Sequence, residues 1–116
     1  MPGTRQPQTG FHRFDPETGQ WSALAPVPTP RCDPGALAVE GRIYLFGGWG
    51  GERPYHTVVE AYDIASDTWS TEAPLPERKA WMGTAAVDGR IFVMGGARAR
   101  EGGGYRWIDE VHELVS

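Results

Sequence analysis

An all-β fold made of repeated antiparallel units is predicted by two features of the sequence. Sixteen glycines and ten prolines interrupt its 116 residues at short intervals, and no stretch keeps a 3.6-residue apolar period, which favours short strands over helices. Two stretches, residues 36–48 and 84–96, read ALAVEGRIYLFGG and TAAVDGRIFVMGG and lie 48 residues apart. An internal period of this length is typical of proteins that repeat one supersecondary unit.

Each of these two stretches has the pattern of a β-hairpin. Two apolar runs flank an acid-glycine pair, Glu40-Gly41 in the first copy and Asp88-Gly89 in the second. Such a pair favours a type I′ turn, because glycine adopts a positive φ without strain and the turn matches the twist of the strands. The runs are almost continuously apolar, so both faces of these strands are expected to be buried.

The repeat extends beyond the hairpins. The same offset places Phe14-Asp15 on Tyr62-Asp63 and Trp21 on Trp69. Apolar or alternating runs bounded by turn residues predict the remaining strands. These are expected over residues 11–15, 20–25, 58–64, 68–73 and 108–115, with a flexible lead over 1–10, proline-containing connections over 26–35 and 74–83, and a loop over 97–107.

Together, these motifs resemble the kelch repeat, a family of β-propeller proteins. The resemblance rests on the glycine pairs, the aromatic-Asp pairs and the tryptophan six or seven residues later, and it covers nearly all of residues 11–115. It implies four-stranded antiparallel blades, with the hairpin as the two inner strands and the tryptophan on the outermost strand. It assigns residues 11–30 to the outer strands of a preceding blade, 31–76 to a complete blade and 77–116 to a partial blade.

About two blades do not close a ring, since propellers have roughly four to eight. Two explanations stay open. The chain is a piece of a longer propeller, or copies associate so that residues 20–25 of one chain supply the outer strand that the second blade of the next chain lacks. In the second case three copies make a six-bladed ring, although one strand, over 11–15 or 108–115, is then surplus. Exposed blade faces and edges would otherwise favour aggregation.

Composition and charge exclude several classes of function. The net charge of −4 disfavours nonspecific nucleic-acid binding, which needs a positive field. No apolar run is long enough to cross a membrane as a helix, and the first ten residues contain no apolar leader, so a cytoplasmic protein is expected. Cys32 is the single cysteine, so no internal disulfide forms. Ten arginines against one lysine fit a GC-rich, bacterial coding sequence.

A binding surface is expected on one face of the blades. In an antiparallel four-strand meander, the tight hairpin turns share one end and the longer loops share the other. The loop end collects arginines and aromatic residues, the types enriched at protein-interface hot spots. A noncatalytic protein-interaction module is therefore predicted, whose partner is another protein or a second copy. Its candidate binding residues are Arg31, Trp49, Arg53, Tyr55, His56, Arg78, Trp81, Arg98, Arg106 and Trp107.

Catalytic, metal and cofactor sites are not expected. The histidines His12, His56 and His112 show no metal-ligand spacing, and none lies beside Cys32. A Cys32 nucleophile would need a histidine partner, for which the sequence gives no sign. The pair Asp63 and Asp67 falls at turn positions, where aspartate accepts backbone hydrogen bonds. The glycine pairs are expected to serve backbone geometry, because they open no helix and precede no phosphate-binding lysine.

A carbohydrate-related function is the alternative. Kelch propellers of this type resemble those of bacterial sialic-acid epimerases and copper-dependent galactose oxidases. Sugar rings stack on aromatic side chains, and Trp49, Tyr55, Trp81 and Trp107 offer such surfaces. The copper ligand pattern has no visible counterpart in this sequence, and epimerase catalysis requires loops from several blades.

Overall fold

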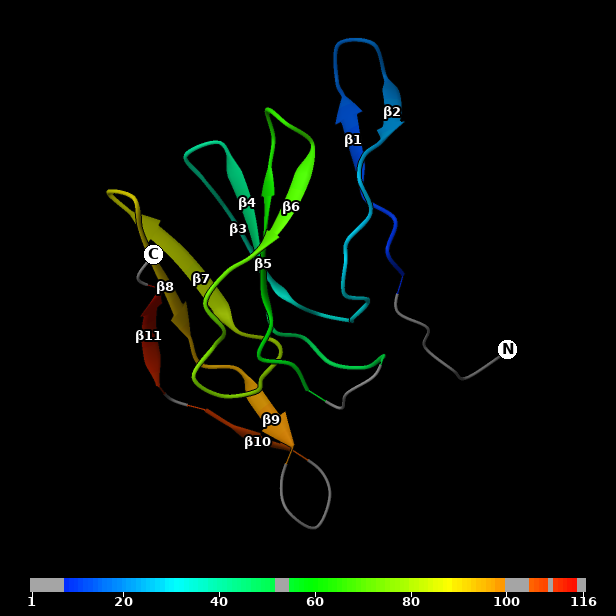
Figure 1. Cartoon of the computed structure of the whole chain (residues 1–116). Coiled ribbons are helices and arrows are strands. Elements are labelled where there is room, and N and C mark those ends of the chain that lie inside the picture. The colour runs from blue at the N-terminus through cyan, green and yellow to red at the C-terminus, as the bar shows by residue number, and fades with distance from the viewer. Residues whose placement is uncertain (1–7, 52–54, 100–104, 109, 115–116) are drawn as a thin grey trace.

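The computed structural model describes residues 8–51, 55–99, 105–108 and 110–114, and over these residues the fold is all-β, as predicted, with eleven strands and no helix (Figure 1). All of the pairings are antiparallel. The strands are β1 (His12–Asp15), β2 (Gln20–Ala23), β3 (Gly35–Val39), β4 (Arg42–Phe46), β5 (Val59–Asp63), β6 (Thr68–Thr71), β7 (Gly83–Val87), β8 (Arg90–Met94), β9 (Ala97–Ala99), β10 (Tyr105–Trp107) and β11 (Val111–Leu114).

The strands are arranged as two blade-like sheets and two ribbons. The first sheet has four strands in the order β3-β4-β5-β6, and the second has three in the order β11-β8-β7. The β1-β2 ribbon stands beside the first sheet, and the β9-β10 ribbon extends from the opposite end of the molecule (Figure 1). Both sheets have the meander order of kelch blades, and the second sheet has no fourth strand among the described residues.

The hairpin turns confirm the prediction made from the acid-glycine pairs. Glu40 and Gly41 have φ values of 50° and 76°, and Asp88 and Gly89 have 51° and 76°. Positive φ at both central residues is the mark of a type I′ turn. The two hairpins therefore share their turn geometry as well as their sequence.

The glycine pairs also serve backbone geometry, as expected. Gly47, Gly48, Gly95 and Gly96 all have positive φ. A Cβ atom on Gly47 would collide with the carbonyl oxygen of Lys79, and one on Gly96 would lie 2.7 Å from the carbonyl oxygen of Ala80. These glycines let the ends of both inner hairpins approach the β6-β7 connection, which enters the second blade.

Burial differs between the two sheets. The core is built mainly from the first sheet, where Tyr44, Phe46 and Val59 are buried. The expectation that both faces of both hairpins are buried is wrong: Ala36 and Ala38 on β3 are exposed, and in the second sheet Val87 is 56% exposed and Met94 is 36% exposed. The reason is that one face of this sheet packs toward β3 while no described element covers the other face.

The N-terminal ribbon is tied to the first blade by the predicted repeat residues. Phe11 packs edge-on against Tyr62 and Trp69, with ring centroids 4.7 and 5.1 Å apart. The Trp69 indole donates to the carbonyl oxygen of Ala25 at 2.9 Å. Asp67 accepts from the Ala25 amide at 2.9 Å and from the Tyr62 hydroxyl at 2.6 Å. The bond to Asp67 raises the pKa of Tyr62 to about 12.

The expected loop over residues 97–107 contains two strands instead. β9 and β10 pair with the register Arg106 to Arg98 and Trp107 to Ala97. The prediction failed here because the sequence between the two strands is rich in glycine and the strands are only three residues long. Most of the expected flexible lead lies outside the described residues, although Thr9 accepts a hydrogen bond from the Val27 amide at 2.9 Å.

The loops and turns separate onto opposite ends of the blades. The β1-β2, β3-β4 and β5-β6 turns lie at one end, and the loop after β4 and the β9-β10 ribbon lie at the other (Figure 1). The end with the longer loops is called the loop face below. Among the described residues no helix long and apolar enough to cross a membrane is found.

Candidate functional site

An aromatic cluster is the most prominent feature of the loop face. Trp49 and Trp81 lie with ring centroids 6.3 Å apart, and Tyr55 meets Trp81 edge-on at 6.1 Å. Trp49 and Tyr55 come from the loop between β4 and β5, whereas Trp81 comes from the connection between β6 and β7. The fold therefore unites three of the residues that the sequence suggested, and we call them the loop-face aromatic cluster.

Trp81 occupies a backbone conformation that is unfavourable for its residue type. Its φ is +56°, and the residue 48 positions earlier, Asp33, has φ +50°. Aspartate tolerates the left-handed region, but for a bulky residue this conformation is an outlier that costs of order 1–3 kcal/mol. Trp81 is nevertheless 44% exposed. A large apolar side chain is thus held at the surface on a strained backbone.

Asp33 organises the rest of the cluster. Its carboxylate accepts a hydrogen bond from the Trp49 indole at 2.8 Å, and its carbonyl oxygen accepts from the Trp81 amide at 3.4 Å. Trp49 is further fixed by backbone bonds to Cys32 at 2.7 and 2.9 Å. The backbone bridge between Cys32 and Trp49 recurs 48 positions later, between Ala80 and Ala97 in the second blade. It is therefore part of the repeated backbone of the blade, and this backbone positions the cluster.

Two of the suggested residues are buried and have structural partners. Arg31 is 7% exposed, and its guanidinium donates to Glu60 at 2.7 Å, to the carbonyl of Gly47 at 2.5 Å and to that of Thr29 at 2.8 Å. The ring of His56 is paired with the carbonyl of Gly50 at 2.7 Å. Neither side chain belongs to the exposed loop face, because long-range contacts bury both.

The remaining suggested residues are spread more widely. Arg78 lines a hollow of about 410 Å³ with His56 and Glu72. Arg98, Arg106 and Trp107 belong to the β9-β10 ribbon, where Trp107 is 69% exposed. Arg53 lies outside the described residues.

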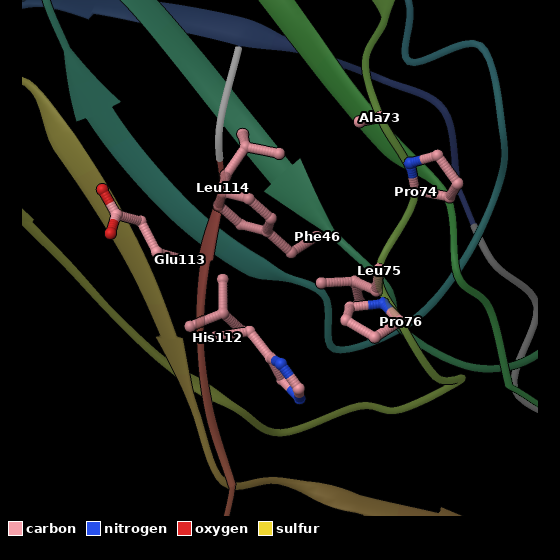
Figure 2. Close-up of a pocket in the computed structure, with 9 residues that line it drawn as sticks. Phe46, Ala73, Pro74, Leu75, Pro76, His112, Glu113 and Leu114 are labelled. Atoms are coloured by element: carbon pink, nitrogen blue, oxygen red, sulfur yellow. The ribbon is translucent and has the colours of Figure 1, made fainter.

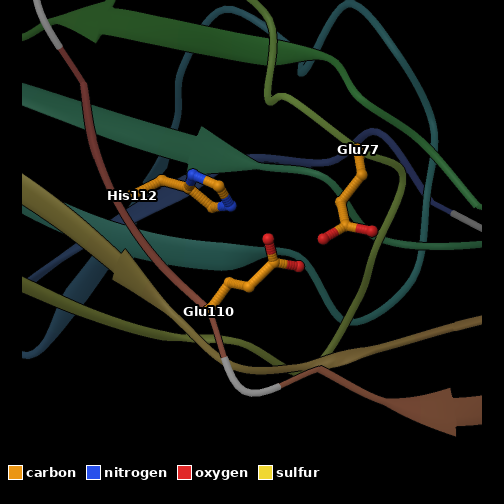
Figure 3. Close-up of side chains that lie close together, drawn as sticks. All are labelled: Glu77, Glu110 and His112. Atoms are coloured by element: carbon orange, nitrogen blue, oxygen red, sulfur yellow. The ribbon is translucent and has the colours of Figure 1, made fainter.

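A second group of polar side chains gathers where the β6-β7 connection meets β11. The carboxylates of Glu77 and Glu110 and a ring nitrogen of His112 all lie within 4.8 Å of one another (Figure 3). Lys79 is fully buried beside them, and Arg98 approaches Glu77 at 3.5 Å. Burial lowers the pKa of Lys79, against the opposing effect of the two nearby carboxylates. We call these five residues the inter-blade polar cluster.

The inter-blade polar cluster is the counterpart of a buried ion pair in the first blade. Lys79 lies 48 positions after Arg31, and Glu77 lies 48 positions after Thr29. His112 is paired with Val93 in the second sheet as Glu60 is paired with Leu45 in the first. The Thr29, Arg31 and Glu60 set of the first blade is thus replaced by Glu77, Lys79 and His112.

The two sets differ in how well their polar atoms are satisfied. Glu60 accepts from both Arg31 and Thr29, each at 2.7 Å. In the second set the Lys79 ammonium nitrogen and the Nε2 atom of His112 are buried and have no hydrogen-bond partner among the described residues. The side chains of the first set hydrogen-bond to one another, whereas the second set contains buried nitrogen atoms without a hydrogen-bond partner among the described residues.

An apolar gap adjoins the inter-blade polar cluster. It has a volume of about 150 Å³ and is lined by Phe46, Leu75, His112 and Leu114, among others (Figure 2). Ligand pockets usually measure roughly 300 to 1,000 Å³. This gap is therefore a packing space between the first sheet and β11, too small for a metabolite.

The residues that the sequence raised as a nucleophile or a carboxylate pair, Cys32 and the Asp63 and Asp67 pair, have structural roles. Cys32 forms a backbone bridge with Trp49, and its thiol is in no disulfide. Asp63 accepts from the Ser66 hydroxyl at 2.5 Å, and Asp67 serves the Ala25 amide and Tyr62. Both aspartates have structural partners, although Asp63 accepts from a side-chain hydroxyl and Asp67 from a distant amide, and not from the local backbone as expected.

Sequence reasoning missed the inter-blade polar cluster. Comparing the charged residues of the two repeats would have paired Lys79 with Arg31, but His112 follows a lengthened loop, so a fixed 48-residue offset does not align it with Glu60. Histidine spacing alone gave no signal, because the other groups are carboxylates distant in sequence.

The comparisons with known proteins identify the repeat. Residues 30–76 match the family model of the Kelch motif. Kelch-like protein 31 of Homo sapiens is 40% identical over 50 residues, and Kelch-like protein 31 of Danio rerio is 38% identical over 50 residues. Each match covers 42% of this chain and 8% of the relative. Residues 30–76 therefore match a kelch repeat, and the antiparallel sheets of the all-β fold are consistent with kelch-type blades.

Proposed function

We propose that the chain is a noncatalytic protein-interaction module whose binding surface is the loop-face aromatic cluster together with the neighbouring arginines. Kelch repeats suggest protein interaction in general. The surface assigned to it here is carried by one observation, the exposed Trp81 on a left-handed backbone between Trp49 and Tyr55.

The strain at Trp81 supports a role in binding. A polar residue fits the same conformation in the first blade, where Asp33 stands. An exposed tryptophan contributes little to packing, so its cost is not offset by core burial. Tryptophan, tyrosine and arginine are the residue types that dominate interface energies. The cluster therefore has the composition and the rigid support of a binding hot spot.

The surrounding charge favours a partner that presents acidic groups or free backbone carbonyls. Arg78 lies three residues from Trp81, and Arg98 and Arg106 face each other across the β9-β10 ribbon. Like charges opposite each other on neighbouring strands are unfavourable unless an acid neutralises them. One acid, Glu77, approaches Arg98 at 3.5 Å, and the side chain of Arg106 is exposed.

The test is a selection of binding peptides from a random displayed library against the whole chain. Selected peptides are expected to bind the Trp81→Ala variant at least about 30-fold more weakly, the loss typical of a hot-spot residue. Trp21→Ala is the matched control, because Trp21 is 68% exposed on the distant β1-β2 ribbon, and it is expected to leave binding unchanged. Equal loss in both variants, or none in Trp81→Ala, would contradict the proposal.

The same experiment separates protein binding from the carbohydrate alternative. Aromatic clusters also stack against sugar rings, so the chain is tested in parallel on a glycan array and by titration with sialic acid and galactose. Saturable binding there that depends on Trp81, without peptide binding, would replace the proposed partner by a carbohydrate. Silence on the array leaves the protein partner as the proposal.

A second copy of the chain is a further candidate partner. β11 is an edge strand of its sheet, Val111 on it is 61% exposed, and Trp21 on the edge ribbon β2 is 68% exposed. Exposed strand edges pair readily with other chains. Light scattering decides the matter: a mass near 38 kDa, about three times 12.7 kDa, supports a three-copy ring. A monomer contradicts it.

A further inference from the structure

We propose that Glu77, Glu110 and His112 form a binding site for a divalent transition-metal ion of the Zn²⁺ class, located where the connection between the two blades meets β11. This site is distinct from the loop-face aromatic cluster and does not depend on the proposed binding function. It also departs from the sequence expectation, which considered histidine spacing only.

The geometry suits a small cation. One ligand atom from each of the three residues lies within 4.8 Å of the other two (Figure 3). Ligands of a tetrahedral zinc ion at about 2.1 Å lie roughly 3.4 Å from one another. Side-chain rotations that shift the ligand atoms by about 1 Å would bring them to this separation. Glu110 is exposed while Glu77 and His112 are half-buried, so an ion can enter from solvent.

A buried ring nitrogen of His112 without a hydrogen-bond partner among the described residues is the independent sign that the site lacks a bound ion. Among the described residues the buried side-chain atoms without a hydrogen bond are the ammonium nitrogen of Lys79, Nε of Arg98 and Nε2 of His112. All three belong to the inter-blade polar cluster. Lys79 has no exposed surface, and its charge acts on Glu77 and Glu110. Buried polar groups are normally paired. The nitrogens of Lys79 and Arg98 are cationic, and Nε of Arg98 already lies 3.5 Å from Glu77, so only the unpaired Nε2 atom of His112 points to a metal ion.

The first blade shows that the fold does not impose this deficit. At the equivalent positions Thr29, Arg31 and Glu60 satisfy one another. In the second blade the strand acid is replaced by a histidine, and carboxylates appear at positions 77 and 110. The substitutions convert a closed ion pair into three groups that are all ligands of borderline metals.

The donor set selects the class of ion. One imidazole nitrogen with two carboxylates favours Zn²⁺ and its first-row neighbours over Mg²⁺ and Ca²⁺, which prefer oxygen ligands throughout. Three protein ligands leave at least one position for water. Arg98 contacts Glu77 at 3.5 Å and helps to orient that carboxylate.

The neighbouring cations set the affinity. The Lys79 ammonium already interacts with the carboxylates of Glu77 and Glu110, and the Arg98 guanidinium with that of Glu77. A bound ion would compete with both cations for these carboxylates. Binding in the micromolar range is therefore expected, weaker than at a dedicated structural zinc site. An ion held here would also fix the β6-β7 connection, in which Glu77 lies four residues before Trp81.

Isothermal titration of the whole chain with ZnCl₂ and with MgCl₂ tests the site. Wild type is expected to bind one equivalent of Zn²⁺ and no Mg²⁺. His112→Ala is expected to weaken Zn²⁺ binding by about 100-fold, the scale on which changes at metal sites act. His12→Ala is the matched control, since His12 is an exposed histidine on β1, and it should leave the affinity unchanged.

Further variants keep the test decisive if His112→Ala fails to fold by circular dichroism. Glu110→Gln changes an exposed side chain and should also remove binding, while Glu110→Asp should retain most of it. Lys79→Met removes the competing charge and should tighten binding by about 10-fold. Equal Zn²⁺ affinity in wild type, His112→Ala and Glu110→Gln, or no saturable binding at about 1 mM Zn²⁺, would overturn the proposal.

Discussion

Arg31 in the first blade and Lys79 in the second occupy equivalent buried positions, yet their surroundings differ. Arg31 donates through all three guanidinium nitrogens, to Glu60 and to the carbonyls of Gly47, Thr29 and Leu45. Lys79 has a buried ammonium group with no hydrogen bond to any residue that the structure describes. The repeat therefore places a buried cation in each blade, and of the two only Arg31 is fully hydrogen-bonded.

The difference reflects the chemistry of the two side chains. The planar guanidinium offers five donors in a fixed fork, which matches several carbonyls and a carboxylate at once. An ammonium is a compact point charge on a flexible stem and depends on acids that can move toward it. A blade can thus keep its backbone unchanged while its interior changes from a closed ion pair to an open polar cluster.

Breaking the closed pair should produce the largest effect. Arg31→Leu leaves the Glu60 carboxylate, 3% exposed, without its counter-ion. Removing one partner of a buried pair costs about 3–5 kcal/mol, so the free energy of unfolding in urea is expected to fall by that amount. Arg42→Leu, at an ion pair of 3.8 Å with a part-exposed side chain, should cause little change. Similar losses in both variants would show that the Arg31 pair is not special.

The glycine pairs allow a second comparison between the blades. A methyl group on Gly47 collides with the carbonyl of Lys79, whereas one on Gly95 meets only the carbonyl of Ile108, at 3.3 Å. Gly47→Ala should therefore lower the free energy of unfolding by about 3 kcal/mol, and Gly95→Ala by about 1–2 kcal/mol from the positive φ alone. Thermal and urea unfolding measure both. Equal losses of stability in the two variants would mean that the positive φ, and not the close approach to Lys79, explains the need for glycine at position 47.

Removing the unpaired cation should act in the opposite direction. Lys79→Met keeps most of the side-chain volume and removes a buried charge that makes no hydrogen bond. A buried polar group without a hydrogen bond costs free energy, so its replacement by an apolar group is expected to raise the free energy of unfolding by about 1 kcal/mol in metal-free buffer. A loss of stability would indicate that Glu77 and Glu110 depend on the ammonium, as Glu60 depends on Arg31.

The smallest effect is expected in acid, at the junction between the N-terminal ribbon and the first blade. The hydrogen bonds from the Ala25 amide and the Tyr62 hydroxyl lower the pKa of Asp67 below its usual 3.8. The contribution of Asp67 to the free energy of unfolding is therefore complete above about pH 4, and it is lost as the pH falls through the lowered pKa of this carboxylate. Asp67→Asn should reduce the loss of stability between pH 5 and pH 2, followed by tryptophan fluorescence during urea unfolding. Identical pH profiles would exclude this role.

Much of the fold was predictable from the sequence. The acid-glycine pairs predicted both type I′ turns, the 48-residue offset predicted equivalent strands, and the tight contacts at Gly47 and Gly96 agree with a backbone role for the glycine pairs. The β9-β10 ribbon was missed because its strands are short and a glycine-rich segment lies between them.

The candidate sites were predictable only in part. Trp49, Tyr55 and Trp81 were chosen as aromatic loop residues and do come together. Arg31 and His56 were chosen by the same rule and are buried. Residue type and loop position do not distinguish these cases, because burial depends on which distant segment packs over each side chain.

By itself the sequence determined the repeat and the hairpin turns, since these depend on local backbone preferences and apolar periodicity. The strand order of the blades was implied by the resemblance to kelch repeats. The tertiary structure alone decided that Glu77 and His112 meet beside Lys79, and that Trp81 stands exposed between Trp49 and Tyr55. Those contacts join residues from different strands and loops. Their distances follow from how two sheets pack, which no local pattern encodes.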